Sequence, residues 1–131
     1  MNDIKLMNKA ADNIRILAAS MVEKAKSGHP GGAMGGADFV NVLFSEFLVY
    51  DPKNPAWEGR DRYFQDPGHM SPMLYSVLAL AGKFTIDELK EFRQWGSVTP
   101  GHPEVNVMRG IENTSGPLGQ GHTYAVGAAI A

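Results

Sequence analysis

The protein has 131 residues, of which 44% are hydrophobic and 20% are charged, with a formal net charge of −2 at pH 7. This length allows one domain with a hydrophobic core and is too short for two. The slight negative charge argues against a nucleic-acid-binding protein, which would normally carry a basic face. The absence of cysteine excludes disulfides, thiolate metal sites and a cysteine nucleophile.

The N-terminal segment predicts an amphipathic helix from Asp3 to about Lys26, which Gly28 can end in a left-handed conformation. Its predicted buried face recurs at three- and four-residue steps: Leu6, Ala10, Ile14, Leu17 and Met21. A glycine-rich loop, Ser27–Gly36, is expected to follow. The next predicted helix carries Val40, Leu43, Phe44, Phe47 and Leu48.

The middle of the chain predicts one strand and two more helices. Arg62–Gln65 is short and aromatic, and it is the one convincing strand candidate. Ser71 is expected to cap a helix that Gly82 closes, with a buried stripe of Leu74, Val77, Leu78 and Ala81. Residues 85–88 form a capping box that starts a helix running to about residue 94.

The C-terminal part is expected to be mostly loop from Ser97 to Gly121, followed by a helix of small apolar residues. No cap, glycine stop or polar tail follows this last stretch. We therefore expect the chain to be a fragment of a larger fold, with more strands downstream.

The sequence also bears on the cellular compartment of the protein. The chain contains no apolar run near the roughly 18 residues of a membrane-spanning helix, and its first twenty residues carry charges throughout, unlike a signal peptide. We expect a cytoplasmic protein that does not interact with a membrane.

All four histidines directly follow a glycine: His29, His69, His102 and His122. A glycine lets the backbone bend or approach a ligand closely, and the imidazole after it titrates near neutral pH. Because the pairs lie on separate segments, the pattern indicates a polar site assembled from loop tips.

Each of these histidines also has a purely structural interpretation. His29 could point to solvent from a glycine-rich connector, and His69 could cap a turn. The loop of His102, held by two prolines, could be structural, and for His122 we favour a capping or packing role. A zinc site is disfavoured, because the spacings resemble no short chelating pair and no cysteine assists.

The glycine-rich turn Gly116–Gly121 precedes the last helix. Backbone amides free of side-chain bulk at a helix N-terminus can bind an anionic or polar group. The spacing G-x-x-G-x-G matches neither the dinucleotide fingerprint nor the Walker loop. A tight, close-packed start to the helix is an equal alternative.

Five motifs, in their order and spacing, resemble transketolase over essentially the full length of the chain. They are Lys26–Gly31 (KSGHPG), Asp61–Phe64 (DRYF) leading into Gly68-His69, Phe92–Gln94 (FRQ), Thr99–Glu104 (TPGHPE) and Thr114–Gly121 (TSGPLGQG). The 1-deoxyxylulose-5-phosphate synthases share the architecture and a Gly-His pair after the first strand. They differ at the segments corresponding to SGHPGG and PGHPE.

The resemblance implies an α/β fold. Residues 1–131 would be the N-terminal, mostly helical part of a thiamine diphosphate-binding domain, truncated after one short strand, with the remaining parallel sheet missing downstream. The resemblance further implies transfer of a two-carbon ketol unit from a ketose phosphate to an aldose phosphate, in the pentose phosphate pathway.

The resemblance also assigns roles by motif. His69 would hydrogen-bond the diphosphate of the cofactor, and Gly116, Pro117 and Leu118 would line its ring system. His29 and His102 would be the catalytic and substrate-binding residues, because an imidazole with a pKa near 6.5 can bind hydroxyls and move protons.

The sequence departs from the commoner family pattern at two positions. Asp66 stands where many members have serine, and His122 replaces a usually aliphatic or small residue. The magnesium motif and the glutamate that activates the cofactor would lie beyond Ala131, so no metal ligand is expected in this chain and Mg²⁺ belongs to the parent enzyme.

The parent enzyme would be a homodimer acting on sugar phosphates, and we expect the isolated chain to be inactive. Three alternatives stay open: a non-catalytic phosphate or sugar-phosphate binding module, a non-functional remnant that folds poorly, and a fragment of a 1-deoxyxylulose-5-phosphate synthase-like enzyme.

Overall fold

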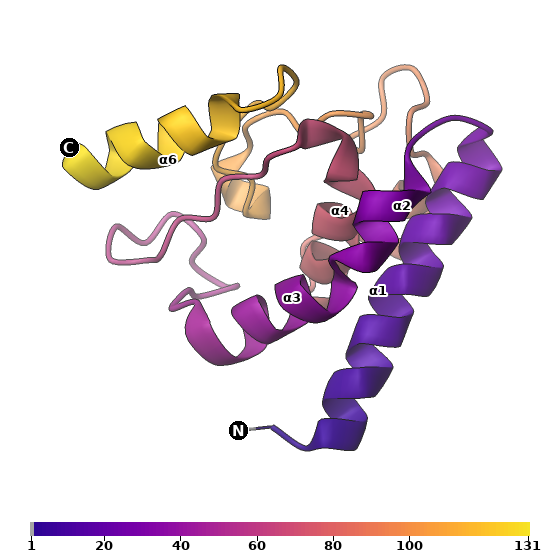
Figure 1. The fold of residues 1–131 in the computed structure, drawn as a ribbon, viewed down its shortest axis with the longest axis horizontal. Helices are drawn as coiled ribbons and strands as arrows, with labels where there is room; N and C mark the ends of the chain where they lie inside the picture. Colours follow the sequence, from indigo (N-terminus) through magenta and orange to yellow (C-terminus); the bar gives the residue numbers. More distant parts are fainter. Residues whose placement is uncertain (1) are drawn as a thin grey trace.

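The computed structural model describes residues 2–131, and in this range the chain is mostly helical (Figure 1). Its α-helices are α1 (Ile4–Ala25), α2 (Pro30–Gly35), α3 (Ala37–Val42), α4 (Ser71–Leu80), α5 (Ile86–Lys90) and α6 (Gln120–Ile130). A π-helical turn, η1 (Leu43–Phe47), continues α3, and two 3-10 turns are η2 (Gly68–Met70) and η3 (Val107–Arg109). Long loops join the remaining segments.

Helix α1 begins where the sequence predicts, because the Asp3 carboxylate accepts hydrogen bonds from two backbone N–H groups of the first turn at 2.7 and 3.2 Å. Its buried residues are Ala11, Ile14, Ala18 and Met21. The prediction that Leu6 is buried is wrong, since that side chain is 61% exposed. The left-handed residue that ends the helix is Lys26, with φ 50°, and not Gly28 as predicted.

The glycine-rich segment after α1 is helical and not the predicted loop. Pro30 occupies the first turn of α2, where its fixed φ is already helical. A Cβ on Gly32 would lie 3.0 Å from the Met70 side chain, and one on Gly36 would lie 2.6 Å from Met73 Sδ. The glycines thus let α2 approach the start of α4 closely, and this packing offsets their low helix propensity.

The strand predicted at Arg62–Gln65 is not found, and no strand is assigned elsewhere in residues 2–131. The Gln65 backbone N–H donates to Asn113 Oδ1 at 2.9 Å, and its carbonyl accepts from Asn113 Nδ2 at 3.3 Å. The side-chain amide of Asn113 therefore satisfies the N–H and the carbonyl of Gln65, which are the groups that a neighbouring strand would bond in a sheet.

Helix α4 is the centre of the fold and packs against α1, α2, α3 and α5 (Figure 1). Every residue from Ser71 to Leu78 is buried, so the predicted stripe is only one side of a helix that is covered all round. The Tyr75 ring lies against the rings of Phe84 and Phe92, with centroids 5.4 and 6.4 Å away. Ser71 is the first helical residue and not the predicted cap.

The last two helices differ in how they are held. The capping box of α5 is confirmed: Thr85 Oγ1 accepts from the Glu88 N–H, and the Glu88 carboxylate accepts from the Thr85 N–H. Helix α5 ends at Lys90, one turn earlier than predicted. Helix α6 extends away from the other helices (Figure 1), and Gly121 is its one buried residue.

Candidate functional site

Two of the Gly-His pairs, far apart in the sequence, meet in the structure. His29 is the residue before α2, and His69 lies in η2 directly before α4. Their ring centroids are 4.6 Å apart, with the planes tilted by 44°. The contact follows from the packing of α2 against α4 and η2.

His102 is brought to the same region by hydrogen bonds from α4. Ser71 Oγ donates to the Gly101 carbonyl at 2.7 Å, and the Tyr75 hydroxyl donates to the Pro100 carbonyl at 2.8 Å. Partial burial lowers the pKa of His102, and the charges of Arg93, His69 and His29 lower it further. The imidazole of His102 therefore stays neutral to a lower pH than a free imidazole does.

The turn that follows Ser115 lies directly against the His69 loop. A Cβ on Gly68 would be 2.8 Å from Ser115 Oγ and 3.1 Å from the Gly116 nitrogen. The Ser115 N–H donates to the Pro103 carbonyl at 3.0 Å, which ties the same turn to the loop of His102. Ser115 Oγ is buried and has no hydrogen-bond partner in residues 2–131.

The site is open to solvent both at His29 and His102 and at Gly116. His29 and His102 are exposed, and a Cβ built on Gly116 would meet no atom within 4 Å. An open hollow of about 750 Å³ borders His102, and its lining includes Ser27, Arg93, Trp95 and Glu104. Imidazoles and free backbone groups thus face accessible space, as a binding site for a polar ligand requires.

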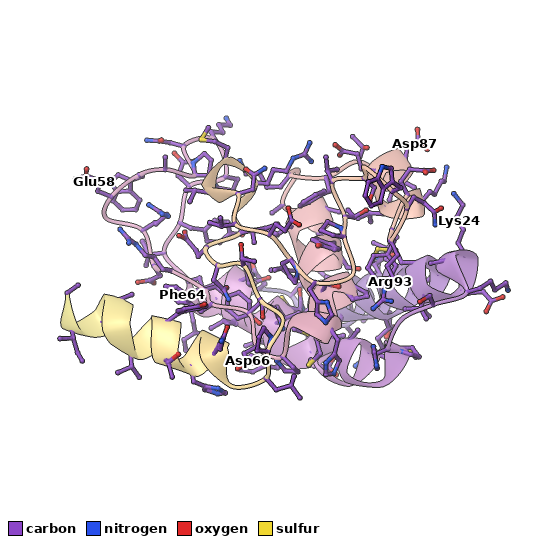
Figure 2. All side chains as sticks on the ribbon, turned by 90° about the horizontal axis from the view of Figure 1, so that it is seen from above. Lys24, Glu58, Phe64, Asp66, Asp87 and Arg93 are labelled. Carbon is purple, nitrogen blue, oxygen red and sulfur yellow. The ribbon has the colours of Figure 1, made fainter. Side chains whose placement is uncertain are left out.

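His122 lies outside this cluster. Its Nδ1 is 3.1 Å from Asp66 Oδ2, and its side chain is 83% exposed while that of Asp66 is 6% exposed. Figure 2 shows Asp66 beside the start of α6. The predicted capping or packing role of His122 is therefore wrong: the residue before α6 is Gly119, and the exposed ring of His122 pairs with the buried Asp66 carboxylate.

Comparison with known proteins identifies the fold. Residues 6–131 match the family described as "Transketolase, thiamine diphosphate binding domain". The chain belongs to the transketolase family. Transketolase 1 of Escherichia coli is 53% identical to it over 122 residues, which cover 92% of this chain and 18% of that protein.

Solved transketolase structures superimpose closely on this chain. The enzyme from Campylobacter jejuni gives a TM-score of 0.92 at 48% identity, covering 98% of this chain and 20% of that one. Transketolase from Pichia stipitis in complex with sedoheptulose-7-phosphate gives a TM-score of 0.90 at 45% identity, and the match covers 95% of this chain and 18% of that one. The chain thus spans about a fifth of the length of these relatives, and its mostly helical fold corresponds to the N-terminal part of a transketolase.

The donor set of this transketolase-family chain consists of imidazoles, hydroxyls and backbone groups. Among residues 2–131 no cluster of three or more histidine, aspartate or glutamate side chains is arranged to hold a metal ion. In the same range, no helix is long and apolar enough to cross a membrane.

Sequence reasoning missed three polar residues at this site: Ser27, Arg93 and Ser115. Arg93 belongs to one of the motifs that resemble transketolase, yet nothing local to that motif indicates which loops its side chain reaches. Its contacts are with residues distant in sequence, so only the folded chain reveals them.

Proposed function

We propose that this chain is the cofactor-facing and substrate-facing N-terminal part of a transketolase. The complete enzyme would transfer a two-carbon ketol unit from a ketose phosphate to an aldose phosphate, in the pentose phosphate pathway, with thiamine diphosphate as cofactor. The observation that carries the proposal is the meeting of His29 and His69, with ring centroids 4.6 Å apart, beside the turn at Gly116.

The residues around this turn fit a cofactor that bears a diphosphate. Ser115 Oγ is buried without a partner among the described residues, Gly116 faces open space, and backbone amides at the start of α6 are available to an anion. His69 would hydrogen-bond the diphosphate, while Gly116, Pro117 and Leu118 would line the rings. When bound, thiamine diphosphate supplies the reactive carbon that carries the ketol unit.

His29 and His102 would bind substrate hydroxyls and move protons. A neutral imidazole accepts a proton at one ring nitrogen and donates from the other. The lowered pKa of His102 favours this neutral form at physiological pH. Both rings are exposed, so a sugar phosphate can reach them without rearrangement of the loops.

We place Mg²⁺ and the group that activates the cofactor on residues outside this chain. Exposed apolar side chains support a homodimeric parent enzyme in which they are covered: Phe39 is 64% exposed, Phe47 70% and Ile130 82%. The lack of cysteine fits a reducing cytoplasm.

A chimera tests this function. In it, residues 6–131 replace the aligned segment of E. coli transketolase 1, and the assay follows ketol transfer from sedoheptulose-7-phosphate to a three-carbon aldose phosphate. We expect the chimera to be active and the isolated chain to be inactive. His29→Ala or His102→Ala in the chimera should each lower kcat/KM by about 10²–10⁴-fold, the usual contribution of a proton-transferring group.

His122→Ala is the matched control, because this histidine lies outside the cluster and should leave kcat/KM unchanged. A folded chimera that binds thiamine diphosphate, measured by calorimetry, but transfers no ketol unit would favour the binding-module alternative. Condensation of pyruvate in place of ketol transfer would favour the 1-deoxyxylulose-5-phosphate synthase-like alternative.

A further inference from the structure

Arg93 contacts the two loops that carry His29 and His102. Its Nη1 donates to Ser27 Oγ at 2.9 Å, two residues before His29. A Cβ on Gly101 would lie 2.6 Å from Arg93 Nε and 2.9 Å from Nη2, so the guanidinium lies directly against the residue before His102. Figure 2 shows Arg93 where the loop after α5 meets the N-terminal helices.

The backbone of Arg93 is fixed as firmly as its side chain. Its φ of 61° is in the left-handed region, which non-glycine residues rarely adopt and which persists only where the surroundings hold it. The Arg93 N–H donates to the Thr99 carbonyl at 3.0 Å, and the buried Thr99 hydroxyl donates to the Glu88 carbonyl at 3.0 Å. The fixed backbone of Arg93 therefore holds the guanidinium between the loop of His29 and the loop of His102.

Within residues 2–131 the guanidinium of Arg93 forms no salt bridge with a carboxylate, although Glu104 lines the same hollow. Its Nε is buried and makes no hydrogen bond to the described residues. The charged and titratable groups around His102 are Arg93, His69 and His29, with Glu104 nearby. Burial lowers the pKa of His102 most, and the charges of the first three groups lower it further. An unpaired cation beside an imidazole favours its neutral form.

We propose that Arg93 is a positioning residue, whose guanidinium spans the loops of His29 and His102 and fixes the positions of the two imidazoles relative to each other. The proposal rests on the proposed function, in which these histidines contact the substrate. A planar guanidinium can lie flat on Gly101 while it donates to Ser27, and a lysine ammonium cannot do both. Gly101 is required for the same reason, because any side chain there would displace the guanidinium.

The first test measures the histidine titrations of the 131-residue chain by NMR, with each ring assigned by substitution. In Arg93→Gln the midpoint of His102 should rise toward its ordinary value of 6.5. In Arg93→Lys it should rise less, because the charge is retained. Ser27→Ala should shift the His29 resonances and leave the His102 midpoint near that of the unmodified chain. Gly35→Ala, where the new Cβ meets open space, is the control and should change neither.

The second test uses the chimera. Arg93→Gln should lower kcat on the order of 10–100-fold, the expected effect of misplaced reacting groups, while the affinity for thiamine diphosphate stays within about twofold, since Arg93 does not border the Gly116 turn. Arg93→Lys should recover only part of the loss.

An unchanged His102 midpoint in Arg93→Gln, with only a lower melting temperature, would overturn the positioning role. If the Arg93→Gln variant does not fold, the Ser27→Ala variant decides. Unchanged His29 resonances in that variant would also overturn the positioning role of Arg93. A chimera without ketol transfer, in which the titrations nonetheless shift as expected, would refute the proposed function and leave the link between the two loops established.

Discussion

At the scale of single residues, the glycines before the histidines serve the packing of one loop against another. A Cβ on Gly68, Gly101 or Gly121 would lie 2.8, 2.6 or 2.5 Å from an atom of a facing segment, closer than real Cβ atoms come. Gly28 is the member of the set with a left-handed backbone, at φ 132°. The glycines of the Gly-His pairs therefore lie where two segments pack closely against each other. His29, His69 and His102 come together because their loops pack together.

Gly68→Ala should destabilise the chain by about 1–3 kcal/mol, the usual effect of forcing an extra carbon into a packed site. The new Cβ would meet Ser115 Oγ and the Ser115 carbonyl carbon at 2.8 and 2.9 Å. Urea unfolding followed by circular dichroism measures the change. Gly116→Ala, in the facing turn and with no atom within 4 Å of the new Cβ, should change stability by less than about 0.5 kcal/mol. Equal effects of the two substitutions would contradict the packing account.

The two positions that depart from the commoner transketolase pattern face each other. Asp66 and His122 approach to 3.1 Å at the start of α6, and the histidine is largely exposed. The contact joins a buried carboxylate to an exposed imidazole, and it is an ion pair only when the imidazole is protonated. The two replacements are therefore one local change that leaves the cluster of His29, His69 and His102 untouched.

At the scale of elements, α5 shows how a helix of only five residues is held by its ends. One oxygen of the Glu88 carboxylate closes the capping box, and the other accepts from Arg109 Nη2 at 2.7 Å. The Arg109 guanidinium also lies over the Phe84 ring, 4.8 Å from its centroid. These bonds, chiefly the one from Arg109, lower the pKa of Glu88 to about 2.

Glu88 should therefore make stability depend on pH in the acid range. Because its pKa in the folded chain lies below the ordinary 4.5, its contribution is present above that value and is lost as the pH falls toward about 2. The difference in unfolding free energy between the unmodified chain and Glu88→Gln should shrink as urea titrations move from pH 7 to pH 3.

Glu58→Gln, on an exposed loop and with no side-chain hydrogen bond or salt bridge in residues 2–131, is the control and should show no such trend. Thr85→Ala removes the other half of the capping box and should cost about 1 kcal/mol at neutral pH. A pH-independent difference for Glu88→Gln would show that its bonds to Arg109 and Thr85 do not form in solution.

At the scale of the whole molecule, α4 is the scaffold on which the site is assembled. It follows His69 directly, it holds the loop of His102 through Ser71 and Tyr75, and it supports α2 behind His29. Helix α6 has no comparable support, since Val126 is 58% and Ile130 82% exposed. Stability should therefore be unevenly distributed along the chain.

Native-state hydrogen exchange of the 131-residue chain measures this distribution. We expect the amides of α4 to exchange only through global unfolding, because every residue from Ser71 to Leu78 is buried. The amides of α6 should exchange faster through local opening. Equal protection in the two helices would indicate that α6 is covered in solution, for example by a second copy of the chain.

The sequence by itself determined the features that depend on neighbours a few residues away. The start of α1 at about Asp3, the capping box of α5 and the end of α4 near Gly82 are correctly predicted, because each depends on bonds or backbone angles within one turn. The motifs around three of the Gly-His pairs, together with Phe92–Gln94 and Thr114–Gly121, also sufficed to place the chain in its family.

Only the tertiary structure decided the features that depend on distant partners. Residues 30–35 are helical where they pack on α1 and α4, and at the end of the predicted strand Arg62–Gln65 the side-chain amide of Asn113 bonds both backbone groups of Gln65. The link from Arg93 to Ser27 and Gly101 likewise joins three segments. Such contacts form when helices close over a shared core, and local sequence pattern carries no information about which segments that core will bring together.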